Sequence, residues 1–249
     1  MQTYRSELHV HTVLSPCAGV EMIPPLIVQT ALKNGLRLLA VTDHNSSANA
    51  RAVIEAARGT ELSVLPGMEL QTREEVHLLC LFDTLQQSEA WQKIVEAALP
   101  NLANKPDFFG EQFIVDATGD FLRREERLLL NSTRLTLAEA ARHVTALGGL
   151  AIPAHVDRPA NGLIPLLGLI PPGFAALEIS RHLSPAAARE KFPQLREQVL
   201  IQNGDVHYQN DFLGTTRLRL EEPTIAEIRL ALEGENGRSI SIDNLLAQI

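Results

Sequence analysis

The distribution of hydrophobic and polar positions along the chain predicts alternating strands and helices. Residues 36–42 (LRLLAVT) are almost all apolar, which is typical of a strand buried on both faces of a parallel sheet. Residues 24–34 begin with two prolines and are followed by Gly35, which are start and stop signals of a helix. An earlier strand is expected over residues 5–13, and a helix capped by Asn45 or Ser46 is expected to run through residue 58. The first part of the chain therefore predicts a β–α–β–α series.

The same alternation continues to the end of the chain. Strands are expected at residues 63–69 and 76–82, then a helix at 86–99, a polar connection at 101–110 and a hairpin over 113–121 that turns at Thr118-Gly119-Asp120. Helices are expected within 123–130 and 137–147, strands at 150–153, 176–179 and 199–203, and a helix at 224–232. The uncharged stretch 159–177 is interrupted by prolines and glycines, which favours a loop with short helical pieces over a membrane span. About seven βα units without a repeat or linker predict a single α/β domain, residues 1–249, that closes into a barrel.

Composition narrows the class of protein. Of 249 residues, 45% are hydrophobic and 21% charged, which predicts a globular fold and excludes a disordered or fibrous chain. The net charge of −8 and the aromatic content of 4% argue against a strong nucleic-acid-binding surface. The chain starts without the apolar segment of a signal peptide, and Cys17 and Cys80 are far apart in sequence, so we expect a cytoplasmic protein with free thiols.

Histidines and carboxylates occur where the predicted strands end. His9 and His11 are two residues apart in a strand, so both side chains leave the same face, and Asp205 and His207 repeat this spacing near a late strand. Of the other candidates, Asp43 and His44 come just after the second predicted strand, Glu69 ends the third and His155 follows the strand at 150–153, whereas His77 lies within the fourth. The carboxyl ends of barrel strands meet at one rim, so these side chains are expected to form one cluster. Such a set of nitrogen and oxygen donors suits Zn²⁺, Mn²⁺ or Fe²⁺.

These motifs, taken in order, resemble the PHP (polymerase and histidinol phosphatase) domain family of metal-dependent phosphoesterases. The similar segments are Glu7-Leu8-His9-Val10-His11-Thr12, Thr42-Asp43-His44, Gly67-Met68-Glu69, Val76-His77-Leu78-Leu79, Pro153-Ala154-His155 and Gly204-Asp205-Val206-His207. The similarity extends from about residue 5 to residue 210. It implies a distorted (β/α)7 barrel with two or three divalent transition-metal ions, Zn, Mn or Fe, at the carboxyl-terminal rim.

The resemblance also implies three groups of metal ligands. The first group comprises His9, His11, Glu69 and Asp205. In the second, Glu69 bridges to a metal that His77 and His155 also hold. The third comprises His44, His207 and a residue after the first strand. Here the chain departs from the family, because Ser15-Pro16-Cys17-Ala18-Gly19 stands where members usually offer Asp or His. Cys17 is the candidate ligand of this segment, and the alternative is a small residue that packs under the loop.

A cluster of this kind suits hydrolysis, because two cations that share a water lower its pKa and present a bridging hydroxide to an electrophile. The resemblance implies a phosphomonoester of a small phosphorylated metabolite or nucleotide as substrate, or else a phosphodiester. Glu69, Asp205 and His207 are the expected catalytic residues, and Arg158 and Arg181 are expected to bind the phosphate, unless they are solvated loop arginines. Two alternatives stay open: an amidohydrolase-type hydrolase, and a non-catalytic metal-binding scaffold of a larger assembly.

Overall fold

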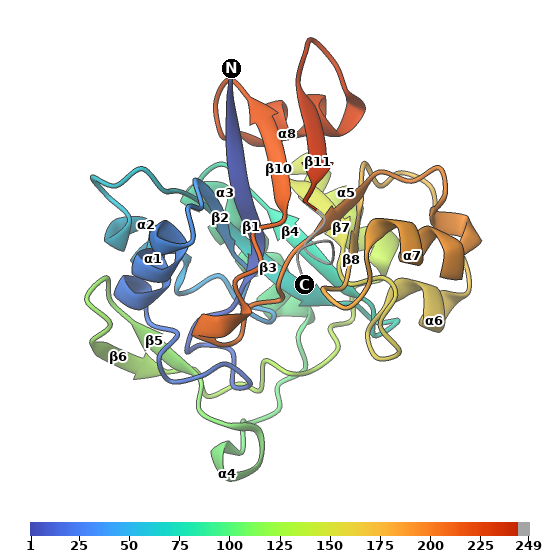
Figure 1. The fold of residues 1–249 in the computed structure, drawn as a ribbon. Helices are drawn as coiled ribbons and strands as arrows, with labels where there is room; N and C mark the ends of the chain where they lie inside the picture. The colour runs from blue at the N-terminus through green and yellow to red at the C-terminus, as the bar shows by residue number, and fades with distance from the viewer. Residues whose placement is uncertain (244–249) are drawn as a thin grey trace.

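The computed structural model describes residues 1–243 and is built on one large curled sheet (Figure 1). Its strands follow the order β11-β10-β1-β2-β3-β4-β7, and β8 and β9 form a separate parallel pair. The strands are β1 (Gln2–Val10), β2 (Leu38–Val41), β3 (Ser63–Gln71), β4 (His77–Leu81), β5 (Phe113–Val115), β6 (Phe121–Arg124), β7 (Leu150–Pro153), β8 (Leu177–Ile179), β9 (Leu200–Gln202), β10 (Thr216–Leu220) and β11 (Ser239–Ile242).

Helices cover the outside of this sheet, with α1 and α2 on one flank and α5, α6 and α7 on the other (Figure 1). The α-helices are α1 (Pro24–Lys33), α2 (Ala50–Ala56), α3 (Leu85–Ala98), α4 (Pro106–Phe109), α5 (Leu137–Ala146), α6 (Leu163–Leu167), α7 (Pro185–Lys191) and α8 (Ile225–Glu233), and the 3-10 helices are η1 (Pro193–Leu195) and η2 (Gln209–Asp211). Within residues 1–243, every helix is too short or too polar to span a membrane.

Seven strands, β1 to β4 and β7 to β9, form a distorted barrel of the TIM type. Backbone hydrogen-bond ladders connect β1, β2, β3, β4 and β7 in this order. Isolated backbone hydrogen bonds then connect β7 to β8, and the segment after β9 to β1. The N–H of Val156, after β7, donates to the carbonyl oxygen of Glu178 in β8 at 2.8 Å. On the other side, Val206 exchanges backbone hydrogen bonds of 2.9 Å with His9 and His11. The predicted α/β barrel is confirmed.

The barrel interior and the helix contacts are both apolar. One cluster of buried side chains, including Leu8, Leu38, Leu79 and Ile152, fills the space enclosed by the strands. A second cluster, which includes Trp91 on α3, packs the outer face of β3, β4 and β7 against the helices. Burial of both strand faces explains why residues 36–42 lack the alternation of a half-exposed strand.

Four sequence-based expectations about the elements are wrong or incomplete. The helix expected within 123–130 is absent from the described chain, because residues 121–124 pair with β5 as β6 after the predicted turn. The helix expected after an Asn45 or Ser46 cap starts only at Ala50. Asn45 has a φ of 48°, and its side-chain amide donates to the carbonyl oxygens of Leu129 and Asn131 instead of capping the helix. Strand β4 runs antiparallel to both neighbours. Strands β10 and β11, which extend the sheet beyond β1, were not expected.

The single domain expected over residues 1–249 includes 244–249, which lie outside the described residues, and it stays a prediction.

Candidate metal centre

The rim of the barrel brings together every histidine and carboxylate that the sequence singled out as a ligand. His9 lies near the end of β1, and His11 directly follows this strand. His44 follows β2, Glu69 lies near the end of β3, and a backbone bridge joins these two residues. His77 is the first residue of β4, yet it lies on the same rim because β4 is antiparallel and pairs His77 with Gln71 at the end of β3. His155 follows β7, and Asp205 and His207 follow β9.

Glu69 is the central residue of this cluster. Its side chain is 1% exposed and is surrounded by five imidazoles. Oε1 lies 3.2 Å from His9 Nε2, 2.7 Å from His77 Nδ1 and 3.1 Å from His155 Nε2. Oε2 lies 3.4 Å from His11 Nε2 and 2.9 Å from His44 Nδ1. Because its two oxygens face different histidines, this carboxylate has the geometry that a bridge between two cations requires.

The first ligand group, which comprises His9, His11, Glu69 and Asp205, has the spacing of a coordination shell. The Nε2 atoms of His9 and His11 lie 3.2 and 3.3 Å from Asp205 Oδ1. Two ligands of a tetrahedral Zn²⁺ at ordinary bond lengths lie about 3.4 Å apart. These two nitrogens and Asp205 Oδ1 are buried and have no hydrogen-bond partner among the described residues. Buried polar atoms without partners are costly, so the site fits a metal ion.

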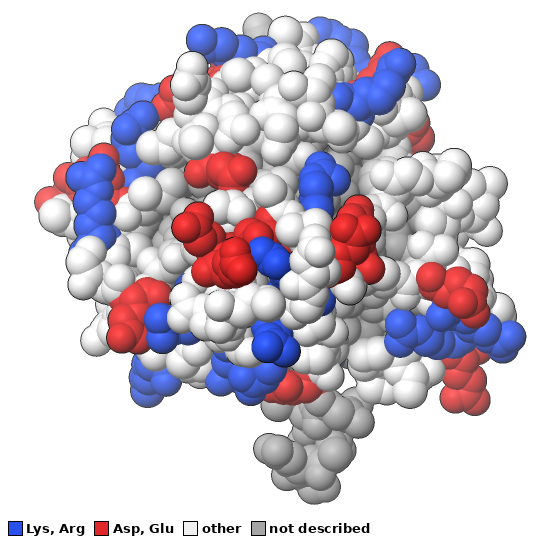
Figure 2. Space-filling view, turned by 90° about the horizontal axis from the view of Figure 1, so that it is seen from above, with Lys and Arg blue, Asp and Glu red and all other residues white. Residues whose placement is uncertain are grey.

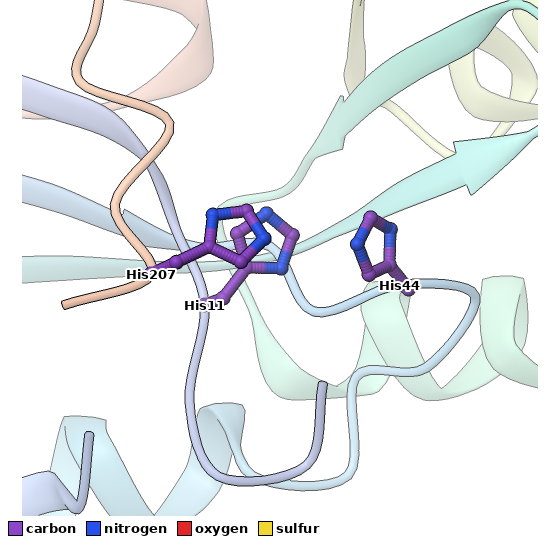
Figure 3. A group of neighbouring side chains, drawn as sticks. All are labelled: His11, His44 and His207. Atoms are coloured by element: carbon purple, nitrogen blue, oxygen red, sulfur yellow. The ribbon is translucent and has the colours of Figure 1, made fainter. Parts of the chain in front are cut away.

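Two further groups adjoin the first. His44, Glu69 and His77 bring donor atoms within 4.8 Å of one another, and so do His11, His44 and His207. Figure 3 shows the imidazole of His207 stacked close to that of His11, with His44 beside them; the ring centroids of His11 lie 4.1 Å from His207 and 4.5 Å from His44. The donor set can therefore accommodate more than one cation.

Cys17 lies beside the third group. Its Sγ is 3.1 Å from His207 Nε2, and the thiol is partly buried in the loop after β1. Burial opposes ionisation of the thiol, but the nearby imidazoles of His44 and His207 lower the pKa of Cys17 to about 6. The thiolate, which is the form that binds metals, is therefore available at neutral pH.

The charges of the centre favour metal binding. Burial works against the ionised form of Glu69, but His77, His9 and His44 hold the pKa of this carboxyl well below its usual range. Burial also lowers the pKa of His77 to about 4, against the attraction of Glu69. Glu69 is thus an anion and His77 a neutral imidazole with a free lone pair; despite their burial, the carboxylates of Glu178 and Glu69 raise the pKa of His9 and of His44 respectively, so these two imidazoles would have to release a proton on metal binding.

Glu178 is a functional residue that the sequence reasoning missed. It is buried in β8, and its Oε2 accepts the backbone N–H of His155 at 2.8 Å and lies 3.0 Å from His9 Nδ1. Its Oε1 accepts from Asn203 Nδ2 at 2.7 Å. A proton on His9 Nδ1 is held toward Glu178, which leaves Nε2 free to face a metal. The signal in the sequence is a glutamate between apolar residues of a buried strand, Leu177-Glu178-Ile179.

Asp43 supports His11, the residue directly after β1, through the hydroxyl of Ser15. Ser15 Oγ lies 2.9 Å from His11 Nδ1 and donates to Asp43 Oδ1 at 2.7 Å. The same Asp43 oxygen accepts the N–H of Thr12 at 2.7 Å. Both histidines of the pair therefore have their Nδ1 atoms bound from behind and their Nε2 atoms directed into the cluster.

Two residues of the cluster have a left-handed backbone. His155 has a φ of 27° and Asp205 a φ of 51°, which are unfavourable for residues other than glycine. In both cases hydrogen bonds fix the conformation: Glu178 binds the N–H of His155, and Glu7 binds the N–H of Gly204 at 2.7 Å. Strain of this kind is typical of functional sites.

Arg158 and Arg181 line a cavity of about 340 Å³ that also touches His155 and Asp205. Arg158 Nη1 lies 2.5 Å from Asp205 Oδ2, the oxygen that does not face the histidines. Arg181 Nη1 lies 2.8 Å from Asp211 Oδ1, and Asp211 also accepts the N–H of His207. The two arginines thus reach the rim, and each is paired with a carboxylate of the Asp205–Asp211 loop.

Metal binding is expected to raise the thermal stability of the protein. Adding Zn²⁺ or Mn²⁺ at about 100 times its Kd to chelator-treated protein would raise Tm by about 5–10 °C, because the ion binds the folded ligand cluster and not the unfolded chain. Differential scanning fluorimetry measures the shift, and mass spectrometry of the metal content is expected to give two or three ions per chain. An unchanged Tm together with less than one bound ion would contradict the metal centre.

The fold and the site together are those of a barrel domain of the metal-binding hydrolase type, and comparison with known proteins supports this class. A model of the PHP domain matches residues 7–161, which is more than half of the chain. This chain belongs to the PHP domain family. No curated protein matches it in sequence.

Several solved structures share the fold. The lesion-specific endonuclease PfuEndoQ from Pyrococcus furiosus is 22% identical with a TM-score of 0.70; the match covers 96% of this chain but only 58% of the endonuclease. A protein from Bifidobacterium adolescentis assigned to the metal-dependent phosphoesterases is 19% identical, with coverages of 82% and 88% and a TM-score of 0.56. An amidohydrolase from Chromobacterium violaceum, with bound sulfate, is 18% identical, with coverages of 98% and 100% and a TM-score of 0.54. At these identities the likeness shows the fold alone.

Proposed function

We propose that this protein is a metal-dependent phosphoesterase that hydrolyses a phosphomonoester of a small metabolite or nucleotide. The observation that carries the proposal is the carboxylate of Glu69 at the centre of five histidines, next to a cavity with two arginines. When bound, the metals lower the pKa of a water molecule and share the negative charge of the phosphate. A phosphate ester is the electrophile that uses both the cations and the arginines.

Each group of residues has a separate task in this proposal. His9, His11, His77 and His155 hold metals with Glu69, and their burial keeps bulk water away from the cluster. The side chains of Asp205 and His207 are each 19% exposed, so they are the donors nearest to an incoming substrate. Arg158 and Arg181 place a phosphate oxygen by charge-assisted hydrogen bonds. Glu178 and Asp43 keep the imidazoles of His9 and His11 in the tautomer that ligation requires.

A phosphodiester is the second candidate substrate, because one structure of similar fold is an endonuclease Q bound to a 27-mer duplex with an abasic lesion. The acidic net charge of the chain favours a small substrate instead. Figure 2 looks onto the end of the barrel at which β1 begins, away from the candidate metal centre, and shows acidic and basic side chains interspersed there, without a continuous basic area among the described residues of this face. The net charge of the chain is −8.

The amidohydrolase and scaffold alternatives rank below a phosphoesterase. The amidohydrolase-type site would normally bring a bridging lysine, but the four lysines, Lys33, Lys93, Lys105 and Lys191, lie in helices or directly before one, and Glu69 occupies the centre of the cluster. A scaffold without catalysis would not need arginines that line a cavity beside the ligands.

Assay of the metal-loaded protein against a panel of esters tests the proposal. Protein reconstituted with Mn²⁺ or Zn²⁺ is expected to release phosphate from phosphomonoesters faster than it cleaves bis(p-nitrophenyl) phosphate, and faster than it cleaves carboxylic esters or amides. Faster cleavage of the diester would favour the second candidate. Turnover of amides alone, or of none of these compounds, would overturn the phosphoesterase proposal.

Cys17 is proposed to be a ligand of the third metal, and its substitution tests this. Cys17→Ser is expected to remove one metal ion per chain and to leave the pair around Glu69 occupied, because Cys17 contacts His207 and not the buried carboxylate. Metal content and anomalous scattering from crystals would show the loss. Cys80→Ser is the matched control, since this thiol is fully buried outside the ligand groups. An unchanged third ion in Cys17→Ser would show that Cys17 is only a packing residue.

A further inference from the structure

His182 is a histidine beside the metal centre to which the proposed function gives no task. It lines the cavity of about 340 Å³ that also contains Arg158 and Arg181. The ligands His155 and Asp205 form part of the same lining, so a molecule in this one cavity can contact the ligand cluster, the arginines and His182 together. His182 itself belongs to none of the ligand groups found within residues 1–243.

The cavity leads from the buried cluster to the surface. His155 and Asn203, each 1% exposed, lie at its buried end, whereas His182 is exposed. The side chains of Arg158 and Arg181 are 41% and 30% exposed. In an in-line displacement at phosphorus, the leaving oxygen lies opposite to the attacking oxygen. Since the attack comes from the buried cluster, the leaving oxygen of a phosphomonoester faces the exposed end of the cavity, where His182 lies.

The backbone on both sides of His182 is held by a residue of β9. Gln202 Nε2 donates to the carbonyl oxygen of Ser180 at 3.0 Å and to that of Leu183 at 2.7 Å. The N–H of His182 donates to Ser180 Oγ at 3.4 Å. Because Gln202 is buried, the turn after β8 has a fixed position and keeps His182 beside the arginines.

The other polar side chains of the cavity already have partners. Glu178 accepts from three donors, one of which is Asn203. The hydroxyl of Ser180 donates to Asp157 Oδ2 at 2.6 Å. An arginine does not release its proton in a protein, whereas a histidine holds and releases one near neutral pH, as a general acid must. Among the residues that line the cavity, His182 is therefore the one suited to give a proton to a leaving oxygen.

We propose that His182 is the general acid that protonates the leaving alcohol. This inference rests on the proposed function and adds a catalytic residue to it. As hydroxide attacks the phosphorus, the bond between phosphorus and the ester oxygen breaks, and its electron pair passes to that oxygen, which takes the proton of the His182 imidazolium. The next water molecule supplies a new hydroxide, and the proton that it loses restores the imidazolium.

Comparison of two esters with different leaving groups tests this role. An alkoxide is a poor leaving group and needs a proton, whereas p-nitrophenolate is stable without one. His182→Gln is expected to lower kcat/KM for glycerol 3-phosphate about 100-fold and to change kcat/KM for p-nitrophenyl phosphate little. His143→Gln is the matched control, because His143 is an exposed histidine of α5 that does not line the cavity. This control is expected to keep the wild-type values for both esters.

A second measurement reports on His182 without turnover. Inorganic phosphate added to Zn²⁺-loaded protein is expected to shift the imidazole C–H signal of His182 in NMR spectra and to leave the signal of His143 in place. Loss of one signal in His182→Gln assigns it. The Kd of phosphate for His182→Gln is expected to stay near that of the wild type, because a general acid acts on the leaving oxygen in the transition state and not on the bound ion.

The outcomes separate this inference from the proposed function. If the wild-type protein hydrolyses neither ester, the phosphoesterase proposal fails. If it hydrolyses both and His182→Gln slows both equally, or slows neither, the function stands and the acid role of His182 is overturned. A His182 signal that does not move when phosphate binds also overturns this role.

Discussion

Glu69→Gln is expected to lower kcat/KM for a phosphomonoester at least about 1000-fold, which corresponds to about 4 kcal/mol of transition-state stabilisation. The substitution keeps the volume but removes the negative charge that faces five imidazoles. A neutral amide cannot balance two cations, and its NH₂ group would point at nitrogen atoms that must keep their lone pairs free. Steady-state kinetics, together with the metal content of the purified variant, measure the effect.

Arg158→Ala and Arg181→Ala are the comparison for this variant. Loss of one arginine removes a charge-assisted contact worth about 2 kcal/mol, or roughly 30-fold in rate, and is expected to leave the metal content unchanged. If Glu69→Gln kept wild-type turnover, or if it lost no more activity than either arginine variant, Glu69 would not bridge the metals. Circular dichroism and Tm identify any variant that fails to fold.

That these histidines and carboxylates lie together could be predicted because strand ends can be read from a single chain. His9 lies near the end of β1 with His11 directly after the strand, Asp205 and His207 lie in the loop after β9, and the barrel closure places these two segments side by side. His77 was predicted for a different reason than the one the structure gives. It was expected within a parallel strand, but it lies on the rim because β4 is reversed and begins there. Strand direction depends on the turn at residues 72–76, whose conformation the hydrophobic pattern does not encode.

The parts of the fold that the sequence did not predict depend on long-range pairing. Residues 123–130 (RREERLLL) favour a helix by composition, yet β6 pairs with β5, and Leu128 and Leu129 are buried by the rest of the chain. Strand β10 was missed although Thr216 to Leu220 alternates buried and exposed residues, because its partner β1 lies more than 200 residues earlier in the chain. Glu178 was missed for the same reason, because it lies far from His9 in the sequence.

Glu178→Gln is expected to weaken metal binding about 10- to 100-fold and to lower kcat/KM to a similar extent. Glu178 accepts from three donors, the N–H of His155, Asn203 Nδ2 and His9 Nδ1, and is 1% exposed. A glutamine has one acceptor oxygen, so its NH₂ group must face at least one of these donors, and its neutral oxygen holds the Nδ1–H of His9 more weakly than a carboxylate does. The proton that Glu178 holds on His9 Nδ1 is then free to move to Nε2, where it blocks coordination.

The loss of metal affinity is the part of this effect that identifies Glu178 as a positioning residue. A buried donor without an acceptor costs about 1–3 kcal/mol, so Tm is expected to fall by several degrees as well. Asp157→Asn is the matched control, because Asp157 is also a buried carboxylate near the rim but accepts only from the N–H and hydroxyl of Ser180. Both variants are expected to lose stability, whereas only Glu178→Gln is expected to lose metal affinity, as measured by titration of chelator-treated protein with Zn²⁺. Equal metal affinity in the two variants would mean that Glu178 supports the fold of the rim and does not orient His9.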